Sequence, residues 1–124
     1  MELCKNRKIA LSKGDLTLKV DNIKKQVLIT LTGQHDEETV QKFFNEYVKH
    51  TSNLDKSKFD LLIDSYLLGV IKPHLLDGVA EAYKCYRDFK SVTFINPMNI
   101  VGKVQLTRIA KENGYMDFFK FVDR

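Results

Sequence analysis

The chain has 124 residues, of which 44% are hydrophobic and 29% are charged, a balance typical of one ordered globular domain. The 20 basic and 16 acidic residues give a formal net charge of +4, with both signs interspersed along the sequence. No apolar run approaches the roughly 18 residues of a membrane span. The lysines are scattered and form no arginine-rich patch with interleaved aromatic residues, so we expect no nucleic-acid partner.

The sequence contains no metal or redox motif. Cys4 and Cys85 are far apart, and the histidines have no ligand spacing with cysteine or with one another; they are His35, His50 and His74. We therefore expect no metal, no cofactor, a buried or half-buried Cys85 and histidines at the surface. The N-terminal MELCKNRK lacks the apolar core of a signal peptide, so we expect a cytoplasmic, reduced protein.

The N-terminal half predicts a hairpin followed by a helix. Residues 1–14 end in a turn signal and form either a tail or a short edge strand, with the domain in residues 15–124. Residues 16–20 alternate apolar and polar side chains, as in a half-buried strand, and pair with the apolar run at 27–31. That second run suits a strand covered on both faces.

A helix should begin after Asp36, whose carboxylate can accept hydrogen bonds from the first free N–H groups, and Glu37 and Glu38 favour its positive end. Its apolar residues follow at helical spacing and predict one buried face: Val40, Phe43, Phe44, Tyr47 and Val48.

Two further strand–helix pairs and a last strand follow. A buried strand at 59–63 ends at Asp64, and a helix starting near Pro73 continues through Tyr86, weakened by Gly78. A strand at 92–95 precedes a helix that Asn99 can cap and that stops at Gly114. We expect this last helix to bury Ile100, Val101, Val104, Ile109 and Ala110. Residues 118–122 predict the final strand.

The element order β-β-α-β-α-β-α-β predicts a single α/β domain. Strands separated by helices favour parallel pairing with right-handed crossovers, and the opening hairpin adds an antiparallel edge. The expected architecture is a mixed sheet of about five strands with helices packed on it.

The stretch Gly33-Gln34-His35-Asp36-Glu37-Glu38-Thr39-Val40 resembles the G-[EQ]-x-D-x-x-T-[AV] signature of STAS domains, the family of anti-sigma-factor antagonists and sulfate-transporter tails. The strand ending at Asp64, the strand ending at Asn96-Pro97 and the helix stop at Gly114 are also similar in order and spacing. The resemblance covers residues 16–123. It implies a STAS-like fold and a regulatory, non-enzymatic role in binding a protein partner.

The chain departs from that family at the phosphorylated serine. The resemblance would put the D-S-S-G motif of the antagonists at residues 72–75, where this chain has Lys72, Pro73, His74 and Leu75. Proline has no hydroxyl group to phosphorylate, and Ser65 lies too early, at the end of a strand. We therefore expect no serine phosphorylation switch.

Polar residues gather where the predicted parallel strands end and helices begin, which is where ligands collect in open α/β sheets. Free N–H groups and cations there could hold an anion. We take Asn99 and Lys103 as the candidate anion contacts. The wider set at this edge includes His35, Lys72, Pro73, His74, Asn96 and Met98. Asp64 is the one candidate acid or base, but no nucleophile–base pair accompanies it, so we expect no enzyme.

The segment from Tyr66 to Ile71 is unusual because it is mostly apolar, although polar residues are expected in a connection between a strand and a helix. It forms either extra core or an exposed patch for a protein partner, self-association or an apolar ligand. The first hypothesis is a protein-interaction module whose surface consists of Tyr66, Leu67, Leu68, Val70, Ile71, Lys72 and His74. The alternative is a carrier or sensor in which this segment lines a pocket and Lys72, His74 or Lys103 fixes an anionic head group. The sequence identifies neither the partner nor the oligomeric state.

Overall fold

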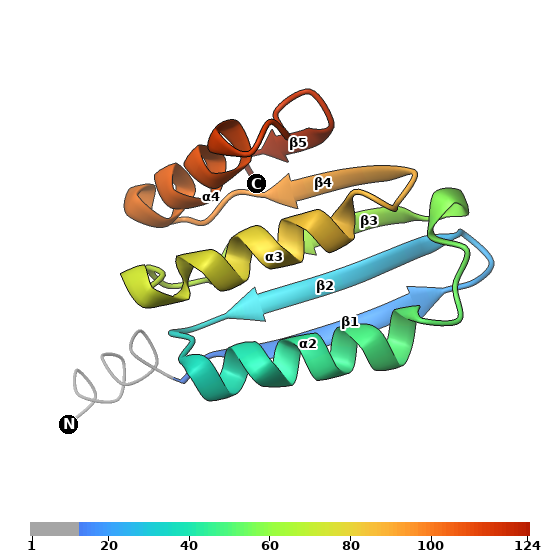
Figure 1. The fold of residues 1–124 in the computed structure, drawn as a ribbon, viewed down its shortest axis with the longest axis horizontal. Helices are drawn as coiled ribbons and strands as arrows, with labels where there is room; N and C mark the ends of the chain where they lie inside the picture. The colour runs from blue at the N-terminus through green and yellow to red at the C-terminus, as the bar shows by residue number, and fades with distance from the viewer. Residues whose placement is uncertain (1–12) are drawn as a thin grey trace.

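A computed structural model describes residues 13–124 (Figure 1). The strands are β1 (Asp15–Asp21), β2 (Gln26–Thr32), β3 (Asp60–Asp64), β4 (Ser91–Ile95) and β5 (Phe119–Val122). The helices are α2 (Glu37–Thr51), α3 (Leu76–Tyr86) and α4 (Ile100–Glu112), with short 3-10 turns η1 (Lys56–Lys58) and η2 (Pro73–Leu75). The predicted element order is confirmed. The prediction for the N-terminal segment lies outside the described residues, except for Lys13 and Gly14.

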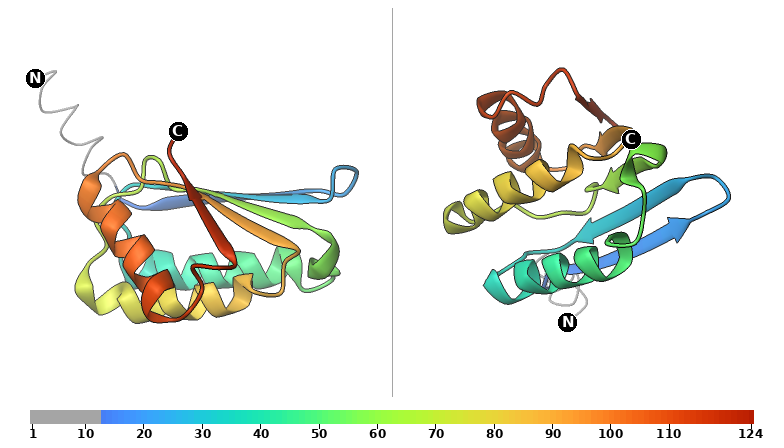
Figure 2. Two further views of the ribbon diagram at one scale, coloured as in Figure 1. Left: turned by 90° about the horizontal axis from the view of Figure 1, so that it is seen from above. Right: turned by 45° about the vertical axis from the view of Figure 1, so that its right-hand side comes forward.

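The strands form one sheet in the order β1-β2-β3-β4-β5, in which β1 is antiparallel to β2 and every later pair is parallel. The α/β fold with a mixed five-strand sheet is therefore confirmed. Each strand–helix–strand unit steps along the sheet in the same direction, and crossovers of one hand then put every helix on one face. Figure 2 shows α2, α3 and α4 together on that face.

The prediction that β2 is covered on both faces is wrong for the described residues. Val27 and Ile29 point to the helices and are fully buried, whereas Leu28 points to the opposite face and is only half-buried. The open face continues across the sheet through paired residues, because Leu28 pairs with Leu62 and Leu62 with Thr93. The physical reason is the strand order, which leaves no crossover on that side.

The start of α2 forms a reciprocal cap. The Asp36 carboxylate accepts a hydrogen bond from the Thr39 N–H at 2.9 Å, and the Thr39 hydroxyl oxygen accepts one from the Asp36 N–H at 2.8 Å. This confirms Asp36 as the cap and fixes where the chain turns from β2 into α2. Val48, which was predicted on the buried face, is instead 59% exposed.

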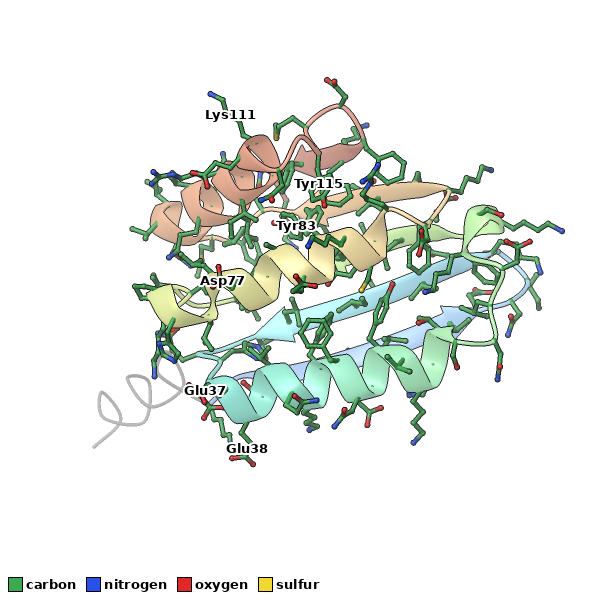
Figure 3. The ribbon with its side chains drawn as sticks, in the orientation of Figure 1. Glu37, Glu38, Asp77, Tyr83, Lys111 and Tyr115 are labelled. Carbon is green, nitrogen blue, oxygen red and sulfur yellow. The ribbon has the colours of Figure 1, made fainter. Side chains whose placement is uncertain are left out.

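The main core lies between the sheet and the helices and is rich in aromatic rings. Tyr83 is its centre: it is 1% exposed, and its ring lies 5.2 Å from the rings of Phe94 and Phe119. Its hydroxyl group donates a hydrogen bond to the Leu106 carbonyl at 3.0 Å, which ties α3 to α4. Figure 3 shows Tyr83 and Tyr115 in the region between these helices.

Of the five residues predicted to be buried in α4, two are buried and three are exposed. Ile109 and Ala110 are buried, together with Gly102 and Leu106, at a spacing that makes one helical face. That face packs toward α3, so the first-turn residues on the other side remain in solvent. The exposed residues that were expected in the core are Ile100, Val101 and Val104.

We predict that Tyr83→Phe lowers the free energy of unfolding by about 1 kcal/mol, because one buried hydrogen bond is lost, and that Tyr83→Ala lowers it by about 3–5 kcal/mol. Ile100→Ala is the control and should change it by less than about 0.5 kcal/mol. Urea unfolding followed by circular dichroism measures all three. A loss for Ile100→Ala as large as that for Tyr83→Phe would contradict the exposed placement of the first turn of α4.

Candidate functional site

A cavity of about 90 Å³ lies between the sheet and the two helices α2 and α3. Apolar side chains from the sheet, the helices and the connecting segments make up most of its wall, and among the described residues neither a lysine nor an arginine lines it. The aliphatic and phenylalanine residues of the wall are Leu31, Val40, Phe43, Phe44, Ile63, Leu68, Ile71, Leu75, Val79, Ala82, Phe94 and Leu106. A cavity of this composition favours an apolar occupant over water.

Gly78 in α3 helps to keep the cavity open. It faces α2, and a Cβ atom added there would lie 3.4 Å from Cγ1 of Val40, with room to spare elsewhere. Val40, Phe44, Gly78 and Val79 are only half-buried, whereas most of the wall is fully buried. The cavity therefore approaches the surface between α2 and α3. The sequence showed Gly78 only as a weak point of the helix.

Ser65 supplies a polar group to the wall. It follows β3 and points to the helix side, where its side chain is completely buried and its Oγ atom has no hydrogen-bond partner among the described residues. Its backbone is satisfied, because its N–H donates to the Ile95 carbonyl at 3.2 Å and its carbonyl accepts from Leu68 at 3.0 Å. Only the hydroxyl group remains free to bond an occupant.

His35 supplies a second polar group, and the prediction that it lies at the surface is wrong. Its Nε2 atom is buried without a hydrogen-bond partner in the described part of the chain, while its Nδ1 atom lies 3.0 Å from the Thr39 hydroxyl oxygen. Burial lowers the pKa of His35 below its usual value, and the Thr32 backbone, the Asp36 carboxylate and the backbone and carboxylate of Asp15 oppose that shift only in part. The ring is therefore neutral at pH 7.

The close approach of Gly14 explains how His35 is held inward. A Cβ atom at Gly14 would lie 2.5 Å from the imidazole ring, so only glycine allows the backbone so near. The Gly14 N–H donates to the Gln34 carbonyl, which fixes this contact. Sequence reasoning missed it because the contact joins the start of β1 to the loop after β2.

The segment 66–71 has two faces. Leu68 and Ile71 are 6% and 9% exposed and line the cavity, whereas Leu67 and Val70 are 57% and 39% exposed. Both interpretations of this segment therefore hold in part: half of it is core, and half is surface. Tyr66 is half-buried, with the Arg124 guanidinium 4.4 Å from the centre of its ring.

The apolar character of this segment is tolerated because neighbouring groups bond its backbone. The Gln105 side chain accepts from the Ile71 N–H at 2.9 Å and donates to the Ile71 carbonyl at 2.7 Å. The Asn99 side chain donates to the Leu68 carbonyl at 2.8 Å. Gly33, at a φ of 75° in the left-handed region, donates to the Leu67 carbonyl and accepts from Gly69, both at 2.9 Å.

The predicted anion contacts are engaged elsewhere. Asn99 caps α4, because its Oδ1 atom accepts from the Gly102 N–H at 2.5 Å while its Nδ2 atom bonds Leu68. Lys103 lies 3.1 Å from Oδ1 of Asp123. Lys72, Pro73 and His74 are exposed, and none of the three lines the cavity. The structure thus separates the basic residues of the edge from the apolar pocket.

The exposed half of segment 66–71 belongs to a wider apolar surface. The Met98 N–H donates to the Tyr66 carbonyl at 2.9 Å, which holds the loop before α4 beside this segment. The first turns of α4 add three exposed aliphatic side chains. We call the set the apolar surface; its residues are Leu67, Val70, Met98, Ile100, Val101 and Val104.

The described residues show no group of histidine, cysteine or acidic side chains that could hold a metal ion. Burial raises the pKa of the half-buried Cys85 thiol, which makes it a weaker nucleophile at neutral pH. Asp64 bonds the Tyr66 N–H and the Arg124 guanidinium, each at 3.1 Å. Within residues 13–124, no helix is both long and apolar enough to cross a bilayer.

No protein-family model matches the chain, and no curated protein is significantly similar to it in sequence. Functional inference therefore rests on the cavity and the apolar surface.

We predict that the free energy of unfolding falls as the pH drops below about 7 through His35, whose folded pKa lies below its unfolded value of about 6.5. The unfolded chain binds a proton first as the pH falls, so protonation favours unfolding in that window. His35→Gln should flatten this slope in urea titrations at several pH values. The control His50→Gln should keep the slope that His35 contributes. An unchanged slope in His35→Gln would contradict the burial of the ring.

Proposed function

We propose that this protein is a binding module for an apolar small molecule, held in the cavity between α2, α3 and the sheet. The observation that carries the proposal is the cavity itself, whose wall is apolar except for a few buried polar groups. Small-molecule sites have this composition: hydrophobic walls with a few convergent polar atoms. Ser65 and His35 line it, and each has a buried polar atom without a hydrogen-bond partner among the described residues.

The volume of the cavity limits the size of the group that it can hold. An engineered cavity of about 150 Å³ holds benzene, so a space of about 90 Å³ takes a smaller group or one end of a longer molecule. A longer molecule can extend between α2 and α3, where Phe44 and Val79 are only half-buried. We expect a carrier or sensor without a catalytic step, because no nucleophile is paired with a base at the wall.

The STAS resemblance remains part of this proposal. The elements on which it was based are present in the same order, and Asp36 and Thr39 of the motif form the cap of α2. Pro73 begins η2 at the place where that family carries its serine, so the proposal includes no phosphorylation switch.

We predict that toluene binds wild-type protein with its methyl end in the cavity and its ring extending between α2 and α3, and shifts the methyl NMR signals of Val40, Leu68 and Val79. Gly78→Leu should weaken this binding at least tenfold, because the new side chain extends from α3 into the cavity. The methyl signals of Val48, which is exposed on α2 and does not line the cavity, should not move.

The matched control is Glu81→Leu, which adds the same side chain to the exposed face of the same helix. It should leave the dissociation constant for toluene within about twofold of the wild-type value. Circular dichroism and unfolding curves confirm that both variants fold. If toluene shifts no methyl signal in the cavity, or binds Gly78→Leu as it binds wild type, the proposed function is wrong.

A protein-interaction module is the second candidate, and the apolar surface is the observation that favours it. Six exposed aliphatic or methionine side chains from adjacent segments are more than isolated surface residues, and such patches mark association sites. Lys72 and His74 are exposed nearby in the chain, as the first hypothesis from the sequence required. Leu68 and Ile71 are buried and do not belong to this surface.

We predict that Val70→Asp abolishes capture of a stoichiometric partner in native mass spectrometry of gently isolated protein, because a charge enters an apolar interface. Val48→Asp, on the outer side of α2, is the matched control and should retain the partner. Self-association would appear instead as a concentration-dependent dimer in analytical ultracentrifugation, lost in the same variant. Capture that survives Val70→Asp with the fold intact would exclude this surface.

A further inference from the structure

Two residues that line the apolar cavity each have a buried polar atom without a hydrogen-bond partner among the described residues: Oγ of Ser65 and Nε2 of His35. A buried hydroxyl or imidazole nitrogen without a partner costs about 1–3 kcal/mol, so such atoms are uncommon unless a ligand or water bonds them. β2 and β3 run parallel, and Thr30 pairs with Asp64. The residues that follow both strands therefore lie at the same end of the sheet.

The protonation of His35 defines what it can bond. The Thr39 hydroxyl has a single proton and lies 3.0 Å from Nδ1 of His35 and 3.1 Å from the Asp36 carbonyl oxygen. If that proton goes to the carbonyl, Nδ1 carries its own proton and Nε2 is an acceptor. If it goes to Nδ1, then Nε2 carries the ring proton and is a donor. A hydroxyl group on the ligand can bond Nε2 in either case.

The absence of charged side chains from the described part of the cavity wall disfavours an ionic head group. Within residues 13–124, no lysine, arginine, aspartate or glutamate lines the cavity, and the lowered pKa of the half-buried His35 keeps its imidazole neutral at pH 7. A carboxylate or an ammonium group would lose its hydration there without gaining an opposite charge. The anionic head group expected from Lys72, His74 or Lys103 would have to remain outside this cavity.

We propose, on the basis of the proposed function, that the ligand is an uncharged amphiphile, an alcohol whose apolar body fills the cavity and whose hydroxyl group bonds Ser65 and His35. Ser65 can donate its proton to the ligand oxygen or accept the proton of the ligand. The ligand hydroxyl and the two side chains then satisfy one another. The surrounding hydrocarbon excludes water from these bonds.

The test compares three probes of known chemistry on the full chain: toluene, 1-hexanol and hexanoate at pH 8. We expect wild-type protein to bind 1-hexanol at least tenfold more tightly than hexanoate. Ser65→Ala should weaken the binding of 1-hexanol about fivefold to tenfold, which corresponds to the loss of one hydrogen bond. It should not weaken the binding of toluene. Methyl NMR titrations give the dissociation constants, and unfolding curves verify the fold of the variant.

A second measurement does not depend on any variant. The imidazole ¹⁵N signal of His35 Nε2 should shift when 1-hexanol is added and should stay in place when toluene is added. If hexanoate binds as tightly as 1-hexanol, the inference that the ligand has an uncharged head group is wrong. If Ser65→Ala changes the dissociation constants of toluene and 1-hexanol equally while the Nε2 signal does not respond, that result would mean that water bonds these two atoms. It would overturn this inference and leave the proposed function intact. If neither toluene nor 1-hexanol binds, both this inference and the proposed function are wrong.

Discussion

The constraint on which the structure depends is that the chain always crosses the sheet in one direction. Parallel strands added one after another, with crossovers of one hand, put α2, α3 and α4 side by side on one face. The opposite face has no helix among the described residues. All tight packing must therefore be made in a single layer, and the spacing of helices in that layer decides whether the interior is filled.

The layer is filled unevenly. Between α3 and α4, Tyr83 spans the gap and its hydroxyl group reaches the Leu106 carbonyl. Between α2 and α3, Gly78 presents no side chain to Val40, and the cavity results. An empty space of about 90 Å³ costs about 2 kcal/mol at roughly 24 cal/mol per Å³. A single larger side chain at Gly78 could remove that cost, and the proposed occupant would offset it when bound.

The sequence predicted what depends on local pattern. Strand and helix order, the cap at Asp36 and the cap at Asn99 follow from spacing, turn chemistry and side-chain oxygen atoms at helix starts. The burial of Ile100 and Val104 was wrong because helical spacing shows an apolar stripe without showing which side meets a neighbour. Gly102 and Leu106 meet it instead.

The site was harder to predict because it is built from long-range contacts. His35 is held inward by Gly14, and Ser65 looked like an ordinary strand end. The sequence signal that came closest was the apolar connection at 66–71, because two of its apolar residues, Leu68 and Ile71, line the cavity. Its division into an inner and an outer face depends on hydrogen bonds from Gln105 and Asn99, more than 30 residues away in the chain.

That division links the two candidate functions. Leu68 and Ile71 touch the cavity, while Leu67 and Val70 lie on the apolar surface, and the same short backbone carries all four. An occupant larger than the present space must move the wall, and the connection is a wall element outside the helices and strands, paired with the end of β2 only through an isolated bridge between Leu68 and Gly33. Its hydrogen bonds to Asn99 and Gln105 would carry that movement to α4, whose first turns complete the apolar surface. A ligand-binding module and an interaction module are therefore not competing descriptions here, because occupancy of the cavity would change the surface that a partner meets.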